Sequence, residues 1–383
     1  MYRVLFVIMT LFFCACTLQH KREAEEFENA EFFSLKTPAS LLDIQKELKL
    51  SELADSVWYV PLETHDSILL GDLSGEGRIR YAGNKFYIYD GQQNVVHLFS
   101  EDGKYLNPIA QRGQGHDEFF HLLDFTTIGD TVYVCDFGNK IHRYLSDGVY
   151  LDKILLPKQA YRLVNYSDDT LACYITDNQF THTEEAYSWL IVNTEGDSIM
   201  IAKTPQIRDP NQENENLNYF VHHDFSTKHS VTYKEAFNDS LYYFSPDGEI
   251  VSYGYIDLGI HKISPTKTFE EMVSQKHAMR FKEIFDIPNH LIGECRCFCI
   301  KDERTWFVWD KRTGDFFQLK DSEGRQHITN DLGGPNFKPF ACVYPNLLIG
   351  IAEAADCPDE FASRYAIKMD DNPILIMIKL AKD

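Results

Sequence analysis

The sequence has few basic residues for its length, and they do not gather in runs. Lysine and arginine number 37 against 58 aspartate and glutamate residues, so the formal net charge is −21 over 383 residues. A strongly acidic surface repels nucleic-acid phosphates and anionic lipid headgroups. The shortage of positive charge therefore argues against a nucleic-acid-binding protein, and we expect no nucleic acid among its partners.

Short motifs of common catalytic and metal sites are also missing. The sequence contains no HExxH zinc motif, no Gly-x-Ser-x-Gly elbow, no Walker loop and no Asp-x-Asp-x-Asp-Gly calcium loop. The most metal-like cluster is His222, His223 and Asp224. Adjacent residues on a strand point to opposite faces, so these histidines would not readily share one ion. We expect a surface loop there, and we predict no cofactor.

No apolar run is long enough to span a membrane, which takes about 20 residues in a helix. The main run, at residues 4–13, follows Arg3 and is typical of the apolar core of a signal peptide. The next residues, Phe13-Cys14-Ala15-Cys16, resemble the bacterial lipobox. We predict that residues 1–15 are a lipoprotein signal peptide and that Cys16 is lipidated. Cleavage by ordinary signal peptidase is the alternative.

The segment after Cys16 is polar and rich in glutamate. Residues 16–40 show no sustained apolar periodicity, so we expect a flexible acidic tether. From residue 41 to residue 383 the composition is that of a folded domain, because the chain has 44% hydrophobic and 14% aromatic residues. The protein is thus expected to lie in the cell envelope, anchored through lipid only. Its periplasmic or surface placement stays open.

The cysteines cannot all form disulfides with one another. Of nine cysteines, Cys14 would leave with the signal peptide and Cys16 would carry lipid, so an odd number remains. Cys295, Cys297 and Cys299 alternate along the sequence and would project to one face of a strand. Metal sites usually use Cys-x-x-Cys pairs on turns, and the sequence has no cysteine pair of this kind. We interpret the remaining cysteines as buried thiols that act as small apolar side chains.

Internal repetition is the most informative pattern that is present. The stretches KFYIYDGQQNVVHLFSEDGKYLNPI and TVYVCDFGNKIHRYLSDGVYLDKIL share one layout. Each has an apolar strand ending in Asp, a polar turn, a second strand, an acidic-Gly turn and a third strand. Asp90 and Asp136, which end the first strands, are 46 residues apart. A repeat of about 40–50 residues is typical of a four-stranded propeller blade.

The acidic-Gly turn returns at widening intervals, at Gly103, Gly148, Gly196, Gly248 and Gly314. Widening gaps indicate insertions between blades, and two are visible at residues 208–218 and 266–285. Six apolar residues of the second insertion follow a partly helical spacing: Phe269, Met272, Val273, Met279, Phe281 and Phe285. We therefore predict one helical insertion there.

Four stretches together carry a family resemblance: LADSVWYVPLET, QRGQGHDEF, YLSDGVYLDKILLP and DDNPILIMIKL. The chain resembles the bacterial six-bladed β-propeller lipoproteins, relatives of NHL-repeat proteins. The resemblance covers the chain from about Leu41 onward and implies an all-β fold of six four-stranded antiparallel blades. By length alone, residues 53–380 would accept six blades or seven; the insertions and the resemblance favour six. The strand in SVWYVPLE should then close the ring beside NLLIGIAEA and NPILIMIKL.

The loop QRGQGHDEF could be a phosphate cradle, a metal site or a bend between strands. A phosphate cradle needs glycine amides that lead into a helix, often with a following lysine, and none follows here. Gly113, Gly115, Glu118 and Phe119 match the related family, whereas His116 and Asp117 replace Pro and Gly. We predict a structural turn.

Asp90 and Asp136 receive the same structural interpretation. Each closes a strand, where a carboxylate can accept hydrogen bonds from the backbone amides of the following turn. We also expect the four tryptophans to lie in the core, because they fall in strand-like runs: Trp58, Trp189, Trp306 and Trp309.

Two functions remain open. The first is a non-enzymatic binding or scaffold protein, monomeric and membrane-tethered, whose partner is an envelope protein or a glycan. The alternative is a propeller-type hydrolase, lactonase or lyase, with a metal-assisted site at the central channel in which calcium is possible. Propeller active sites collect single residues from several blades and leave no local motif, so the sequence leaves this alternative open.

Overall fold

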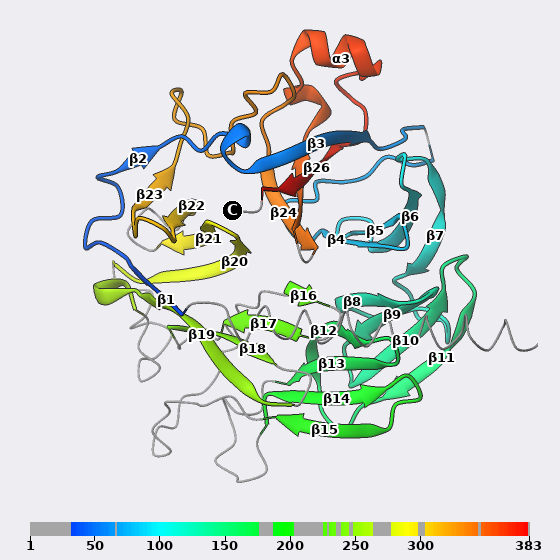
Figure 1. The fold of residues 1–383 in the computed structure, drawn as a ribbon. Helices are drawn as coiled ribbons and strands as arrows, with labels where there is room; N and C mark the ends of the chain where they lie inside the picture. Colours follow the sequence, from blue (N-terminus) through cyan, green and yellow to red (C-terminus); the bar gives the residue numbers. More distant parts are fainter. Residues whose placement is uncertain are drawn as a thin grey trace, which may run out of the picture.

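Six four-stranded antiparallel sheets stand side by side around a central axis (Figure 1). The computed structural model describes residues 32–65, 67–175, 187–202, 225–227, 230–234, 239–244, 248–262, 277–297, 303–343 and 346–381. The predicted six-bladed β-propeller is confirmed.

The blades follow one another along the chain, each from its innermost to its outermost strand. Blade 1 consists of β4 (Arg78–Ala82), β5 (Lys85–Asp90), β6 (Val95–Ser100) and β7 (Tyr105–Gln111). Blade 2 consists of β8 (Leu122–Ile128), β9 (Thr131–Asp136), β10 (Lys140–Leu145) and β11 (Tyr150–Leu155). Blade 3 consists of β12 (Ala160–Ser167), β13 (Thr170–Ile175), β14 (Trp189–Asn193) and β15 (Ser198–Ala202). Blade 4 consists of β16 (Phe225–Thr227), β17 (Ser230–Lys234), β18 (Ser240–Phe244) and β19 (Ile250–Asp257). Blade 5 consists of β20 (Met279–Ile287), β21 (His290–Cys297), β22 (Glu303–Asp310) and β23 (Phe316–Leu319). Blade 6 consists of β24 (Lys338–Val343), β25 (Leu347–Ala352), β26 (Ile374–Leu380) and β3 (Ala54–Pro61).

Blade 6 closes the ring by combining both ends of the chain. The C-terminal strand β26 lies between β25 and the N-terminal strand β3, with Ile376 opposite Tyr59. This is the closure that the sequence predicted. It leaves no open edge between the first and last blades.

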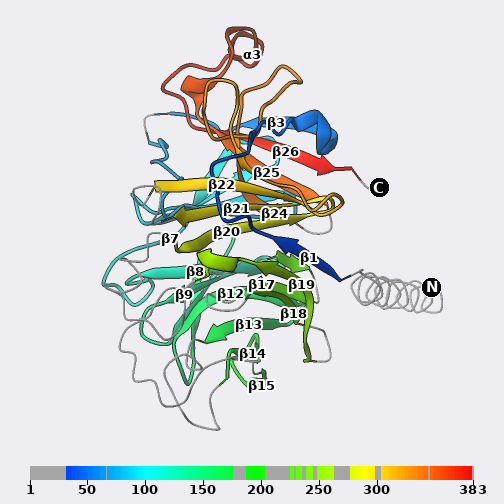
Figure 2. The same cartoon turned by 90° about the vertical axis from the view of Figure 1, so that its left-hand side faces the viewer.

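Two further strands precede β3 and lie on outer edges of the ring (Figures 1 and 2). β1 (Phe33–Lys36) pairs in parallel with β19, and β2 (Gln45–Lys46) pairs in parallel with β23. A Cβ atom at Gly254 would lie 2.6 Å from the ring of Phe33, so glycine makes room for this contact. Ordered structure therefore begins upstream of the boundary that we expected at residue 41.

The hydrophobic core is divided into six clusters, each between two neighbouring blades. Every blade is covered on both faces, so its middle strands are buried on both faces: β13 is buried throughout, whereas the outermost strand β15 is mostly exposed. Each blade is thus held by apolar contacts with the blade before it and the blade after it.

The five acidic-Gly turns all connect the third and fourth strands of a blade. Gly103, Gly148, Gly196, Gly248 and Gly314 have φ angles between 75° and 96°, a region that side chains with a Cβ rarely adopt. Blade 6 has no such turn, because its third and fourth strands come from opposite ends of the chain. This explains why the repeat shows five turns and not six.

The helix predicted at residues 266–285 is wrong for the part that the structure describes. Residues 279–287 form β20, the innermost strand of blade 5. A register shift between Phe281 and Glu283 breaks the alternation of side chains and leaves apolar residues at spacings that resemble a helix. Among the described residues the α-helix is α3 (Asp359–Tyr365), beside the 3-10 turns η1 (Leu50–Glu52), η3 (Gly259–His261) and η4 (Ala354–Asp356). Residues 208–218 and 263–276 lie outside the described part.

Trp58 is not a core residue, contrary to the prediction. It lies on β3, the outermost strand of blade 6, and is 40% exposed, while Trp189, Trp306 and Trp309 are buried. Cys135 and Cys173 are buried free thiols, Cys342 and Cys357 are partly buried free thiols, and Cys295 is buried. Cys299 lies outside the described residues.

Candidate functional site

The loop from Gln111 to Phe119 connects β7 to β8 and uses its polar groups internally. The Glu118 carboxylate accepts hydrogen bonds from the backbone amide of Gly115 (2.8 Å) and from Gln111 Nε2 (2.9 Å), and these bonds lower the pKa of Glu118. A Cβ at Gly113 would lie 1.7 Å from the Glu118 carboxylate, so glycine is needed beside it. Phe119 is fully buried. This arrangement is that of a tight connection between blades.

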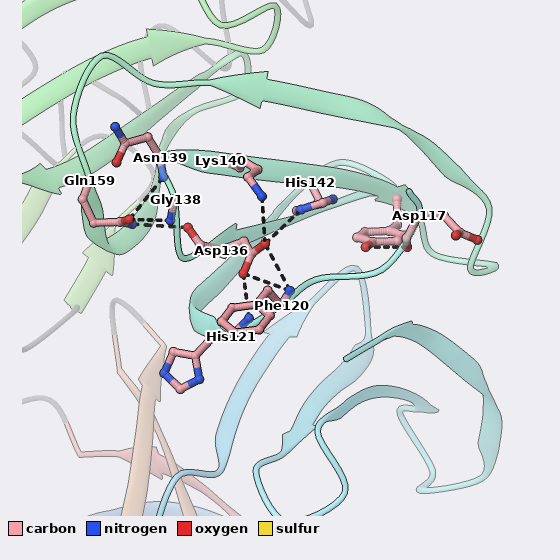
Figure 3. Close-up of polar contacts among 10 residues, drawn as sticks. Asp117, Phe120, His121, Asp136, Gly138, Asn139, Lys140, His142 and Gln159 are labelled. Carbon is pink, nitrogen blue, oxygen red and sulfur yellow. Dashed lines mark hydrogen bonds and ion pairs between the residues drawn. The ribbon is translucent and has the colours of Figure 1, made fainter. Parts of the chain in front are cut away.

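Asp136 organises the same connection from its other side (Figure 3). Its buried carboxylate accepts hydrogen bonds from the amides of Phe120 (3.1 Å) and His121 (2.7 Å) and lies 3.2 Å from His142 Nε2. The amides belong to the segment that enters blade 2, whereas we expected donors from the turn after Asp136. Burial alone would raise the pKa of Asp136, but the hydrogen bonds from His142 and the two amides outweigh it and lower the pKa. Asp136 thus fixes the start of blade 2.

Replacement of Asp136 by Asn is expected to lower stability by about 2–3 kcal/mol at pH 7, because hydrogen bonds to a buried charge are lost. A carboxyl pKa depressed by folding stabilises the protein above the unfolded pKa of about 4 and loses this effect as the pH falls through the folded pKa. Urea unfolding at pH 7 and pH 3 should therefore show a large gap between wild type and Asp136→Asn at pH 7 and a smaller gap at pH 3. Asp55→Asn, at an exposed carboxylate, is the control, and an equal gap at both pH values would contradict the assignment.

Asp90 holds the corresponding position in blade 1. Its carboxylate accepts hydrogen bonds from the amides of Gln92 (2.8 Å) and Gln93 (3.0 Å) in the following turn, and from Gly71 (2.7 Å) in the connection from blade 6. Asp90 therefore links the turn between the second and third strands of blade 1 to the segment that leads into this blade.

The other residues singled out in the sequence lie elsewhere. Cys16, His222, His223 and Asp224 are outside the described residues. Within the described ranges, no group of three or more histidine, cysteine or acidic side chains is placed to hold a metal ion.

A cavity of about 750 Å³ lies at the centre of the ring, lined by the innermost strands of blades 1, 2, 3, 5 and 6. Its volume falls in the range of small-molecule sites, about 300–1,000 Å³. Six cationic side chains line it: Arg78, Arg80, Arg162, Lys282, Arg304 and Lys338. Among the described lining residues the carboxylates are Glu283 and Glu294, both from blade 5, and none is a histidine. A positive cavity in so acidic a chain is the feature that distinguishes this site.

Arg78 and Arg80 form a cluster with Asp124, which we term the arginine cluster. The Asp124 carboxylate has no exposed surface; it lies 2.8 Å from Arg80 Nη2 and 4.0 Å from Arg78 Nε. It also accepts hydrogen bonds from the amides of Phe125 (2.9 Å) and Leu163 (3.0 Å). One carboxylate from blade 2 thus fixes two guanidinium groups of blade 1 and the backbone of blade 3.

Lys282 and Arg304 form a second cluster with Glu294, which we term the blade 5 cluster. Lys282 Nζ lies 3.4 Å and Arg304 Nη1 3.7 Å from the Glu294 carboxylate. Both also donate to one carbonyl oxygen, that of Ser74 in the connection between blades 6 and 1, at 3.1 and 3.2 Å. Two cationic donors therefore converge on one oxygen at the cavity wall.

Burial and the crowding of cations shift the pKa values of ionisable groups in the cavity. Burial, and then Arg162, lower the pKa of the Arg78 guanidinium, as expected where cations are crowded away from water. Burial raises the pKa of Glu283 despite the opposing effects of Arg162 and Arg78. Protonation of Glu283 would remove negative charge from the wall. An anionic ligand would relieve the repulsion among the cations.

Similarity to known proteins extends over most of the chain. The family described as a domain of unknown function, DUF4934, matches residues 34–379. The chain belongs to the DUF4934 family. No curated protein sequence is similar enough to count as a match. The resemblance to NHL-like lipoproteins stays a prediction.

Several solved structures are similar to this DUF4934 chain. A protein from Bacteroides fragilis that is predicted to be exported is 16% identical, with a TM-score of 0.63 over 91% of this chain and 99% of that chain. A DUF4221 family member from Bacteroides vulgatus is 11% identical, with a TM-score of 0.49 over 86% of this chain and 97% of that one. Virginiamycin B lyase from Staphylococcus aureus is 11% identical, with a TM-score of 0.43 over 84% and 99%. The last two scores are too low to carry a functional argument.

The cavity of the DUF4934 chain was not predicted from its sequence. Asp90, Asp136 and the loop from Gln111 to Phe119 are not among the residues that line it. In the part of the chain that the structure describes, no helix is long and apolar enough to cross a membrane.

Proposed function

We propose that the chain is a non-enzymatic binding protein of the cell envelope and that its central cavity holds an anionic ligand. The observation that carries this proposal is the convergence of six cations from blades 1, 3, 5 and 6 on one cavity. The whole chain has 58 acidic residues against 37 basic ones, so chance placement would favour a negative wall. Guanidinium and ammonium groups are the side chains that bind carboxylates and phosphates most strongly.

The cavity supports binding better than hydrolysis or lyase chemistry. The enzyme alternative needs histidines and carboxylates from at least three blades at one mouth of the channel, to donate and accept protons. Both carboxylates among the described lining residues come from blade 5, and Glu294 is already paired with Lys282 and Arg304. The described lining residues therefore do not supply the set of groups from three blades that the enzyme alternative needs.

The binding proposal is tested by thermal unfolding of the purified protein with small organic anions and with sulfate, at ionic strength matched with sodium chloride. A ligand at about 100 times its Kd stabilises the native state by about 2.7 kcal/mol, so we expect the midpoint to rise by about 3–6 °C. Arg78→Gln should lose most of this rise, and the surface variant Lys104→Gln should keep it. A rise that is the same in Arg78→Gln would contradict the proposal. A rise with calcium that EDTA abolishes would favour the enzyme alternative.

Location in the envelope is part of the same proposal. It is supported by the signal-peptide pattern at residues 1–15 and by the similar fold of the Bacteroides fragilis protein that is predicted to be exported. The loops that connect the blades would then be free to contact an envelope protein or a glycan.

Cys16→Ala is expected to move the protein from the membrane fraction to the soluble fraction, since it removes the proposed site of lipid attachment. Fractionation of cells followed by detection of the protein measures this. Cys14→Ala is the matched control and should leave the protein in the membrane fraction. Membrane association that persists in Cys16→Ala would contradict lipid anchoring.

A further inference from the structure

The two cation clusters face the cavity from different blades. The arginine cluster belongs to blade 1, with Asp124 behind it, and the blade 5 cluster contains Lys282 and Arg304. In each cluster one carboxylate serves two cations. A ligand with two anionic groups could place one group at each cluster.

The blade 5 cluster already shows how it would hold an anion. The Ser74 carbonyl oxygen accepts hydrogen bonds from Lys282 Nζ and Arg304 Nη1 together. A carbonyl carries only a partial negative charge, whereas a carboxylate or phosphate oxygen on the same donors would form charge-assisted hydrogen bonds, which are about twice as strong. The geometry for one anionic group therefore exists on this wall.

The rest of the cavity wall suits an organic body between two charged ends. Tyr81, Phe340 and Val343 supply apolar surface that is partly exposed, and Thr126 and Gln326 supply polar groups. A mixture of apolar surface and a few polar groups is typical of pockets for small organic ligands.

We infer that the ligand is a small organic molecule with two anionic groups, one at Arg78 and the other at Lys282 and Arg304. The inference rests on the proposed function, because it specifies the ligand of the same cavity. Carboxylate and phosphate share the chemistry that these donors recognise, so the probes include both.

Two matched pairs of probes test the inference by isothermal titration calorimetry in low salt. Fructose 1,6-bisphosphate, with two phosphate groups, is compared with fructose 6-phosphate, with one; suberate, with two carboxylates, is compared with octanoate, with one. In at least one pair the probe with two anionic groups should bind about ten-fold more tightly or better, since a second charge-assisted contact is worth at least about this factor. Added sodium chloride should reduce the difference in affinity within each pair, because salt screens the interaction between the ligand and the cations.

Two variants locate the two anionic groups of the ligand. Arg78→Gln and the double variant Lys282→Gln/Arg304→Gln should each reduce the affinity for the probe with two anionic groups to about that for its counterpart with one. Lys104→Gln, at an exposed cation outside the cavity, should keep the wild-type ratio, and circular dichroism checks that each variant is folded.

The outcomes separate this inference from the proposed function. Equal affinity of the wild type for both members of each pair would overturn the inference of two anionic groups and leave anion binding intact. An unchanged ratio in both cavity variants would also overturn it. If none of the four probes binds, the inference fails, and a flat thermal response to the wider panel of anions would then overturn the proposed function as well.

Discussion

A chain that ends at Asn372 should fail to fold. The truncation removes β26, which pairs with β25 on one side and with β3 on the other. Six apolar side chains of this strand are almost completely buried: Ile374, Leu375, Ile376, Met377, Ile378 and Leu380. Burial of each contributes about 1.5–3 kcal/mol, so the loss of all six costs about 9–18 kcal/mol. This matches the entire stability of a typical domain, about 5–15 kcal/mol.

Urea unfolding followed by circular dichroism, together with gel filtration, measures the effect of this truncation. The control is a chain that ends at Ala381, which keeps all of β26 and should unfold as the full chain does. A chain ending at Asn372 that stays monomeric and unfolds cooperatively near the wild-type midpoint would contradict closure of the ring by β26.

Asp124→Ala should lower the free energy of unfolding by about 3–5 kcal/mol, because removing one partner leaves buried charge without its counter-ion. Arg78 and Arg80 would lose the carboxylate that they share, and the amides of Phe125 and Leu163 would lose an acceptor. Sulfate should restore part of the loss, since an anion in the cavity can offset the guanidinium charges. Urea unfolding with and without sulfate, at matched ionic strength, measures both effects.

Asp152→Asn is the control for this variant. Asp152 pairs with Arg143 at the outer edge of blade 2, where half of its side chain is exposed. Exposed pairs contribute about 0–1 kcal/mol, so this variant should remain close to wild type. If Asp124→Ala and Asp152→Asn lost the same small amount of stability, Asp124 would not be holding the arginine cluster together.

Much of the fold was predictable because each blade repeats a local pattern. Asp90 and Asp136 end equivalent strands, and the five glycine turns occupy one position in their blades. The helix predicted at residues 266–285 was wrong for residues 279–285, where a bulge near Phe281 changes the spacing of apolar residues within strand β20. Trp58 was misplaced because sequence alone does not distinguish a middle strand from an outermost one.

The cavity could not be predicted because its cations are scattered along the chain. Arg78, Arg162 and Lys338 lie near the starts of three innermost strands, far apart in sequence, and only the ring brings them together. One local signal existed in the stretch RIRYA at β4, where two arginines alternate in a strongly acidic chain. Recognising it would have required knowing that β4 faces the axis.

Anomalous diffraction from a crystal soaked in selenate tests the central claim most directly, since it locates an oxyanion on the molecule. We expect the strongest anomalous peak in the central cavity, within hydrogen-bonding distance of Arg78 or of Lys282 and Arg304. A peak at Arg78 should be lost in Arg78→Gln. A peak at Lys282 and Arg304 should be lost in Lys282→Gln/Arg304→Gln. Selenate bound only on the outer surface, with no peak in the cavity, would contradict the claim that the cations at the centre of this propeller form an anion site.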